Sequence, residues 1–368
     1  MLLFRATIRA NCSKMAKSGP LNTRFPELGR HLEKVSLTSL PTPVREVCCC
    51  HRGRKHAVWI KEDNLTGEAY GGNKVRKLEY LLKRAMDKGC DRVATFGAVG
   101  SHHALATALY AKQLGLDCTS FLSHQKRVAS IPATLNTHLR IGTDLVRYGG
   151  AYSDRIKTLR NSLWGGNTWV IPAGGSSWLG TIGFIEAGLE LAAQIEARLL
   201  PEPSRIYVAT GTMSTAAGLA LGFALAELPV QIHAVRVSHT SIANNAVLRQ
   251  LMNKTVAMLN RLDASFPDDL VTRANIVLRN DYFAGGYAHS NDEIDAAILT
   301  AQEQFDTALE STYTGKAMAA MLNDLHALGS EDAKFVFWNT CHSKPLETPS
   351  DRPVDKDRLP AEFLRYFT

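Results

Sequence analysis

Short runs rich in β-branched and aromatic residues alternate along the chain with longer stretches whose apolar positions recur every three or four residues. The short runs predict strands and the longer stretches predict helices. Predicted strands cover residues 92–97, 118–122, 144–147, 168–171, 206–209, 232–237 and 334–338. Predicted helices cover residues 102–114, 131–141, 181–197, 215–226 and 241–261. This alternation predicts an α/β protein with mainly parallel sheets and helices on both faces.

The length of 368 residues predicts two such units, each a three-layer α/β/α lobe. Ligands of open α/β sheets bind beyond the carboxyl ends of the strands, so the cleft between the lobes is the expected site. Residues 1–40 are expected to be a tail or a peripheral segment. The first 26 residues contain five basic and no acidic side chains, a bias of organellar transit peptides and of disordered tails, and we favour the tail.

Composition narrows the classes of function. The chain is 45% hydrophobic and 21% charged, which is ordinary for a globular protein, and it has no apolar run long enough to span a membrane. The net charge of +7 is too diffuse to predict a nucleic-acid partner. The seven cysteines include an adjacent trio, Cys48, Cys49 and Cys50, without the spacing of a metal site or a disulfide framework. Reduced thiols in the cytoplasm are expected, with an organellar matrix as the alternative location.

Three loops that follow predicted strands carry small and hydroxyl residues. AVGSHH places Ser101, His102 and His103 at the start of a helix, where free N–H groups bind a carboxylate. TGTMSTAAG (210–218) opens another helix and suits a phosphate, although such residues are also ordinary N-caps. AGGSSWLG is either a third anion contact or a tight turn.

The stretch GGNKVRKLEYL (71–81) sets a lysine directly behind two glycines and an asparagine, where a helix is about to begin. A lysine beside a phosphate loop in a two-lobed α/β protein suggests a Schiff base with pyridoxal phosphate. That cofactor is an electron sink for a carbanion next to an amine. The alternative is that Lys74 belongs to a solvated cluster with Arg76 and Lys77.

Six segments between residues 59 and 338 share their order and spacing with one known family. They are WIKEDNLTG, GGNKVRKLEYL, GAVGSHH followed by ALATALYAKQLGL, IPAGGSSWLGTIGFIEAGLELAAQI, VATGTMSTAAGLALG and YTGKAM. The chain resembles the family of D-cysteine desulfhydrase and 1-aminocyclopropane-1-carboxylate (ACC) deaminase, pyridoxal-phosphate enzymes of the tryptophan-synthase β fold, fold type II. The resemblance implies a cofactor in the cleft between a smaller lobe, 78–185, and a larger lobe, 1–77 with 186–368. It also implies a homodimer that acts on a small amino acid.

The resemblance implies a role for each residue that binds the cofactor. Lys74 carries pyridoxal phosphate as a Schiff base, with Asn73 beside it and Lys77 reaching toward the phosphate. Lys77 lies one turn further along the same helix face, as this requires. The phosphate cradle consists of Gly211, Thr212, Met213, Ser214 and Thr215.

On the substrate side, the resemblance implies that Ser101, with the backbone of His102 and His103, holds the substrate carboxylate. Tyr287 and Tyr313 line the substrate side of the ring. With Lys74 and Ser101, these two tyrosines complete the expected catalytic set.

Thr314 stands at the family position that faces the pyridine nitrogen, where the deaminase branch has glutamate. A hydroxyl cannot supply that charge, and the weaker electron sink suits loss of a thiolate by β-elimination. His103 also matches the desulfhydrase branch. The expected chemistry is Cα proton removal by the Lys74 amine, loss of the β-substituent, and hydrolysis to a 2-oxo acid and ammonia. This requires a lowered lysine pKa.

Some positions depart from the family. His102 replaces the asparagine that contacts the 3-hydroxyl of the ring, and a histidine is bulkier and can carry charge. Ser311 and Thr312 stand where Asp-Pro is usual, and Cys341 and His342 replace a glycine pair. The favoured function is a D-cysteine desulfhydrase-like lyase. The alternatives are ACC deaminase, an amino-acid racemase, or a homologue that binds the cofactor or an amino acid without turnover.

Overall fold

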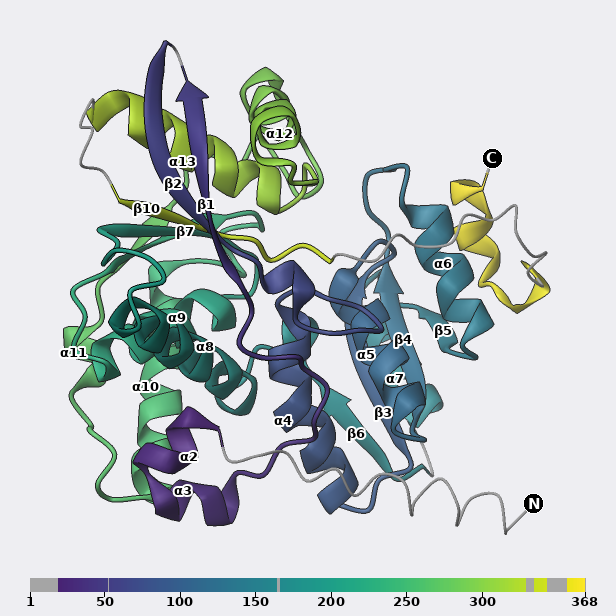
Figure 1. Cartoon of the computed structure of the whole chain (residues 1–368). Coiled ribbons are helices and arrows are strands. Elements are labelled where there is room, and N and C mark those ends of the chain that lie inside the picture. Colours follow the sequence, from purple (N-terminus) through teal and green to yellow (C-terminus); the bar gives the residue numbers. More distant parts are fainter. Residues whose placement is uncertain (1–18, 52, 164–165, 329–333, 343–355, 368) are drawn as a thin grey trace.

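The computed structural model describes residues 19–51, 53–163, 166–328, 334–342 and 356–367. Its larger sheet has six strands (Figure 1). Their order is β1 (Val44–His51), β2 (Arg54–Lys61), β10 (Phe335–Trp338), β7 (Arg205–Thr210), β8 (Gln231–Arg236) and β9 (Ile276–Arg279). The β1–β2 pair is an antiparallel hairpin, and every other pair in the sheet is parallel.

The smaller sheet has four parallel strands. Their order is β5 (Asp144–Arg147), β4 (Asp117–Ser123), β3 (Arg92–Ala98) and β6 (Thr168–Ile171). Helix α4 (Lys74–Asp87) packs against α8 (Trp178–Glu196) of the larger unit and α5 (His102–Gln113) of the smaller one. The predicted α/β fold with two mainly parallel sheets is confirmed.

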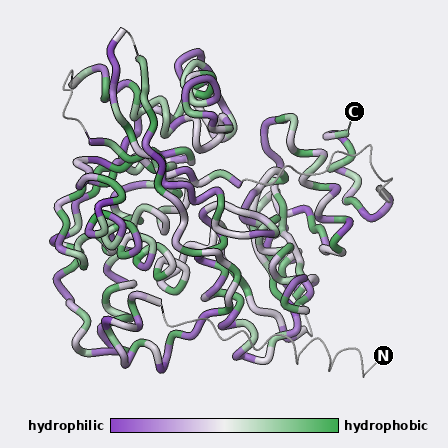
Figure 2. The backbone as a smooth tube through the Cα atoms, in the orientation of Figure 1, coloured by the Kyte–Doolittle hydropathy of each residue, from purple (hydrophilic) through white to green (hydrophobic). Residues whose placement is uncertain are grey.

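Alternating side chains of the larger sheet enter two separate cores. Ile206 and Val208 pack with residues of α8 and α9 (Ser214–Leu225), whereas Tyr207 and Ala209 pack with residues of α12 (Asp292–Phe305) and α13 (Thr314–Leu328). Successive side chains of a strand point to opposite faces, so each face requires its own layer of helices. Figure 2 shows hydrophobic residues concentrated in these strands and in α8 and α9.

The other helices complete the layers. They are α2 (Pro20–Arg24), α3 (Pro26–His31), α6 (Ile131–Arg140), α7 (Tyr152–Leu163), α10 (Asn245–Leu262) and α11 (Leu270–Arg273). Four short 3-10 helices are η1 (Asp63–Leu65), η2 (Ala173–Gly175), η3 (Lys356–Arg358) and η4 (Ala361–Tyr366). Within the described ranges, no helix has the length and apolar character needed to cross a membrane.

All of the predicted strands and helices are present, with ends shifted by a few residues. Side-chain caps set some of the true starts: Ser177 Oγ accepts from Gly180 N–H at α8, and Asn244 Oδ1 accepts from Val247 N–H at α10. The β1–β2 hairpin, β9, α7, α12 and α13 were not predicted. Helix α7 buries no side chain, so it has no apolar stripe that the sequence would reveal.

From residue 19 onward, the N-terminal segment is peripheral and not a tail, which is one of the two expected alternatives. Helices α2 and α3 bury Leu21 and Leu28 completely, and they pack against α8 and α10. They form a peripheral layer on the larger unit. Residues 1–18, which include most of the basic bias, lie outside the described part of the chain.

The last described segment packs on the smaller sheet, although the expected division assigned it to the larger lobe. Phe363 and Tyr366 of η4 are buried with Leu122 of β4 and Ile131 of α6. The Tyr366 hydroxyl lies 3.1 Å from His124 Nδ1. The chain therefore returns to the smaller unit after completing the larger sheet with β10.

Candidate active site

Lys74 begins α4, and the glycine two positions before it fixes where that helix starts. Gly72 has φ of +92°, and a Cβ there would lie 2.7 Å from the carbonyl oxygen of Cys341. Glycine alone tolerates both this conformation and this approach of two backbone segments. The GGNK segment therefore brings the chain after β10 against the start of α4, with Asn73 as the N-cap.

Buried charges anchor α4 to the larger unit. The Arg76 guanidinium donates to Asp63 at 2.7 Å and to Glu190 of α8 at 2.9 Å, and Lys61 of β2 donates to Glu190 at 2.6 Å. Burial alone would raise the pKa of Glu190, but the charges of Arg76 and Lys61 outweigh it and lower that pKa to about 2. Arg76 and Lys77 are each only 1% exposed, so the alternative of a solvated cluster is wrong.

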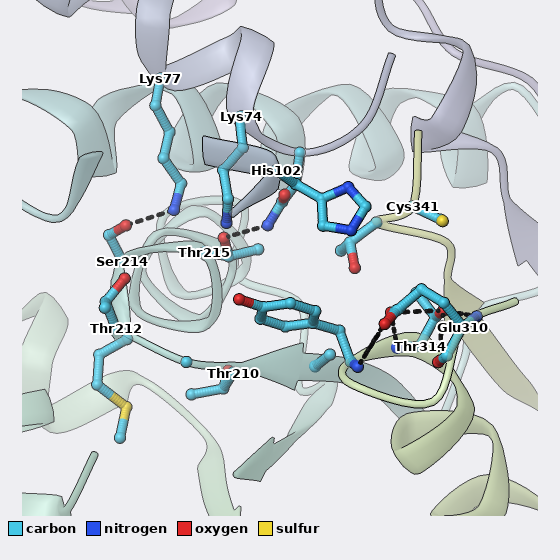
Figure 3. Close-up of a pocket in the computed structure, with 16 residues that line it drawn as sticks. Lys74, Lys77, His102, Thr210, Thr212, Ser214, Thr215, Glu310, Thr314 and Cys341 are labelled. Atoms are coloured by element: carbon cyan, nitrogen blue, oxygen red, sulfur yellow. Dashed lines mark hydrogen bonds between the residues drawn. The ribbon is translucent and has the colours of Figure 1, made fainter. Parts of the chain in front are cut away.

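Lys77 lies one turn after Lys74 and points toward the start of α9 (Figure 3). Its ammonium donates to Ser214 Oγ at 2.6 Å and to the Gly174 carbonyl oxygen at 3.2 Å. Burial lowers the pKa of Lys77 well below its usual value, and the nearby charge of Lys74 adds to the effect. No ion pair found in the described residues joins Lys77 to a carboxylate. A buried ammonium in this situation favours a bound anion.

The turn before α9 lines the same cavity. Its lining includes Gly211, Thr212, Met213, Ser214 and Thr215. The first amides of a helix have no acceptor within the helix, and the N-terminal end of its dipole is positive. A second loop supports this turn, because Ser176 Oγ lies within hydrogen-bond distance of Thr212 Oγ1 (2.6 Å) and of Ser214 Oγ (2.9 Å). Asn73 Nδ2 donates to Thr215 Oγ1 at 3.0 Å.

A second cavity adjoins the first, and Lys74 lines both. Ser101 is the N-cap of α5, and its Oγ accepts from Ala104 N–H at 3.2 Å. His103 lies behind it with Nε2 3.0 Å from Thr95 Oγ1, while its buried Nδ1 has no hydrogen-bond partner among the described residues. The Ser101 hydroxyl and the start of a helix suit a carboxylate.

His102 lines the first cavity, beside the segment that follows β10. Its Nδ1 is 2.8 Å from the Tyr70 hydroxyl, and its ring centroid is 4.8 Å from that of His342. Burial, and then the charges of His342 and Lys74, lower the pKa of His102 to about 3. The charge that a histidine can carry is therefore absent here at neutral pH.

The two expected tyrosines meet at the second cavity. Their hydroxyl oxygens, on Tyr287 and Tyr313, are 2.6 Å apart, and their rings pack edge to face. Burial raises the pKa of Tyr287 to about 12 and that of Tyr313 well above its usual value. Both are neutral phenols at neutral pH. One hydroxyl donates to the other, and the accepting hydroxyl keeps its proton for a ligand.

Thr314 is the first residue of α13 and lines the first cavity beside Glu310 and Cys341. Burial raises the pKa of the Cys341 thiol to about 12, so this cysteine is not an activated nucleophile. Lys74, in contrast, has a pKa that burial lowers to about 8. The lowered pKa that the chemistry requires is present at this lysine.

Comparison with known proteins gives the family. Residues 35–340 match the family of pyridoxal-phosphate dependent enzymes. The chain belongs to this family. It is 35% identical over 317 residues to a D-cysteine desulfhydrase of Klebsiella pneumoniae (strain 342), which covers 82% of this chain and 89% of that protein. A D-cysteine desulfhydrase of a second strain of K. pneumoniae, ATCC 700721 / MGH 78578, is 34% identical over the same length.

Solved structures agree on the fold. A crystal structure of an ACC deaminase homologue superposes with a TM-score of 0.68 at 27% identity, covering 86% of this chain and 93% of that one. An L-serine ammonia-lyase from the fungus Rhizomucor miehei superposes with a TM-score of 0.57 at 17% identity, covering 90% of this chain and all of that one. At that identity the second comparison shows a shared fold type alone.

The cofactor of the enzyme is pyridoxal phosphate, and the cavity fits it. A dianionic phosphate suits the buried Lys77 ammonium and the amides that begin α9. An aldehyde suits the Lys74 amine, whose lowered pKa leaves part of it neutral and nucleophilic. All ten residues expected to bind the cofactor line this cavity, and Ser101, His103, Tyr287 and Tyr313 line its neighbour.

Sequence reasoning missed several residues of the site. Glu310 and Thr340 line the first cavity, and the Tyr70 hydroxyl lies 2.8 Å from His102 Nδ1. Glu310 lies three positions before YTGKAM, in a loop between two helices that were not predicted. An acidic residue just before a helix is a signal of an N-terminus, but without the helix prediction nothing distinguished it from a surface charge.

Proposed function

We propose that the enzyme is a lyase that eliminates the β-substituent of a small D-amino acid, with D-cysteine as the preferred candidate. The products are a 2-oxo acid and ammonia, together with sulfide from D-cysteine. One observation carries the proposal: Lys74, with its lowered pKa, lines both the cavity with the phosphate cradle and the cavity with Ser101 and the tyrosine pair. The 35% identity to a D-cysteine desulfhydrase supports the choice of substrate.

In this proposal the two cavities divide the work. Pyridoxal phosphate, when bound, supplies an electron sink conjugated to the amine of the substrate. Lys77 and the turn before α9 bind the phosphate, while Ser101 and the first amides of α5 bind the substrate carboxylate. The Lys74 amine removes the Cα proton. Tyr287 and Tyr313 are neutral phenols; one donates to the other, and the accepting hydroxyl donates a hydrogen bond on the substrate side.

ACC deaminase is the second candidate, because a homologue of that enzyme shares the fold at 27% identity. Thr314 disfavours it, since the deaminase branch has glutamate at that position. A racemase and a homologue that binds without turnover are the remaining alternatives, the latter because His102 and Cys341 depart from the family pattern.

We also propose a cytoplasmic homodimer in which the cofactor lies between a lobe of residues 78–185 and the rest of the chain, with residues 356–367 packed on the smaller lobe. The family resemblance supports the dimer. The cysteines at 48, 49, 50, 90, 118 and 341 are all free thiols, which suits a reducing compartment.

A panel of D- and L-amino acids, scored for 2-oxo acid and sulfide release, tests the function. We expect release from D-cysteine and no 2-oxobutyrate from ACC. The purified protein should be yellow and lose its colour on borohydride treatment, and Lys74→Ala should lose both colour and turnover. Lys88→Ala, which removes an exposed lysine just after α4, is the matched control. Retained turnover in Lys74→Ala would reject the assignment of this lysine.

A further inference from the structure

Glu310 is the sole carboxylate among the described residues that line either cavity. Its two oxygens accept hydrogen bonds from the backbone N–H groups that begin α13. Oε2 accepts from Thr312 N–H at 2.8 Å, and Oε1 accepts from Tyr313 N–H at 3.0 Å and from Thr314 N–H at 2.8 Å. Figure 3 shows this carboxylate on the opposite side of the cavity from Lys77 and Ser214.

The hydroxyl of Thr314 is fixed by the same residue. It lies 3.1 Å from Glu310 Oε1, to which it donates, and it accepts from the Glu310 backbone N–H at 3.1 Å. A hydroxyl has one proton, and a charged oxygen is the strongest acceptor near it. The proton of Thr314 therefore points to the carboxylate. A ligand meets the hydroxyl oxygen as an acceptor, on the side that it shares with the Cys341 thiol, which also hydrogen-bonds with Thr314.

The chemical structure of pyridoxal phosphate determines which atom of the cofactor faces the side of the cavity formed by Thr314, Glu310 and Cys341. The phosphate arm and the aldehyde are on adjacent ring carbons, and the ring nitrogen is directly across the ring from the aldehyde. With the phosphate at Lys77 and the aldehyde at Lys74, the nitrogen faces the wall away from Lys74. Thr314, Glu310 and Cys341 form that wall.

We propose that Glu310 is a positioning residue that, through the Thr314 hydroxyl, keeps a proton on the ring nitrogen of the cofactor. A hydroxyl that presents only a lone pair binds a protonated nitrogen and not a neutral one. The negative charge of Glu310 stabilises the resulting cation, and the neighbouring Cys341 thiol is neutral and does not oppose it. Thr314 alone lacks a charge, but the Glu310–Thr314 pair supplies one, so the ring is a stronger electron sink than Thr314 by itself implies. This proposal rests on the proposed placement of the cofactor at Lys74.

The test is the nitrogen-15 NMR signal of the holoenzyme loaded with ring-labelled cofactor, compared with free cofactor below and above the pKa of its nitrogen. The wild-type signal should match the protonated reference near neutral pH. In Glu310→Gln it should shift toward the neutral reference. Glu293→Gln is the matched control, because it makes the same change on an exposed residue of α12 and should leave the signal unchanged.

Two outcomes would overturn the proposal. One is a nitrogen-15 signal of the wild-type enzyme at the position of the neutral reference. The other is a Glu310→Gln signal identical to that of wild type, which would show that Glu310 only caps the helix. If Glu310→Gln does not fold, by circular dichroism, Thr314→Val and Thr314→Ser decide. The valine variant should move the nitrogen-15 signal to the neutral position, and the serine variant should keep it at the protonated position. Any other pattern would reject the proposed role of Glu310 and Thr314.

Peptide mapping after borohydride reduction separates this proposal from the assignment of the site. A cofactor adduct on Lys74 together with an unchanged signal in Glu310→Gln would reject the role of Glu310 alone. An adduct on another lysine would reject the placement on which the role depends.

Discussion

At the scale of single residues, environment distinguishes lysines that are alike in sequence. Lys74 and Lys77 belong to one basic run, yet Lys77 is buried and Lys74 is half-buried, and no ion pair among the described residues joins either to a carboxylate. Burial lowers the pKa of Lys74 to about 8. Lys83, further along the same helix, instead pairs with Glu33 and Asp87 at the surface.

The rate at which apoenzyme takes up pyridoxal phosphate should therefore follow the neutral fraction of Lys74. The ammonium form is not nucleophilic, so the rate should rise by about tenfold per pH unit well below the pKa and level off above about pH 8. Stopped-flow absorbance of cofactor binding over a range of pH measures it. An inflection near the ordinary lysine value of 10.5 would contradict the buried environment.

At the scale of elements, one helix carries the site on one side and its anchor on another. Lys74 and Lys77 of α4 line the cavity, while Arg76 connects α4 to Asp63 and to Glu190 of α8. A buried ion pair is costly to break, because the remaining partner keeps its charge without compensation. The anchor therefore fixes the rotation and position of the helix that presents both lysines.

Asp63→Asn should destabilise the enzyme by about 3 kcal/mol, since it leaves the buried Arg76 guanidinium short of a counter-charge. The free energy of unfolding in urea measures the effect. Asp87→Asn removes a carboxylate of a surface pair on the same helix and should cost less than about 1 kcal/mol. An equal loss of unfolding free energy in the two variants would show that the buried Asp63–Arg76 pair contributes no more to stability than a surface pair.

The same anchor predicts how stability depends on pH. The pKa of Glu190 is about 2 in the folded chain, below its ordinary value of 4.5. Its contribution to stability is therefore complete above 4.5 and is lost as the pH falls from there toward 2. Glu190→Gln should flatten the dependence of the urea midpoint on pH within this window, and an unchanged slope would assign the loss to other carboxylates.

At the scale of the whole molecule, the two ends of the described chain pack on different units. Helices α2 and α3 pack on the larger unit, whereas η4 packs on α6 and β4 of the smaller one. The Tyr366 hydroxyl also contacts His124 and Gln125, two residues that line the second cavity. The C-terminal segment thus supports one wall of the second cavity.

Phe363→Ala should destabilise the smaller unit by about 3 kcal/mol, because it empties a completely buried position. Hydrogen exchange followed by mass spectrometry should show faster exchange in α6 and β4, with β7 and β8 unchanged. Leu364→Ala, at the next position and 41% exposed, should leave the exchange as it is in wild type. Faster exchange throughout the chain would show instead that the two units unfold together.

The sequence alone predicted the parallel sheets, because their strands are buried on both faces and read as short apolar runs between turn signals. The β1–β2 hairpin, in which Val44 pairs with Lys61, was not predicted. Polar and apolar residues do not alternate clearly along its strands, so the sequence shows no strand pattern there. It missed α7 because no side chain of that helix is buried. Signals that depend on burial cannot reveal an element that lacks it.

Some features of the site could likewise be predicted from the sequence, whereas others depend on the tertiary structure. The loop from Thr210 pointed to a phosphate because it combines glycine, hydroxyls and a helix start, and the family resemblance added Lys74 and Lys77; the structure places all of them around one cavity. The contact of Glu310 with Thr314, and the lowered pKa values of Lys74 and His102, were decided only by tertiary structure. Burial and the field of neighbouring charges set these properties, and both arise from segments that are far apart in the chain.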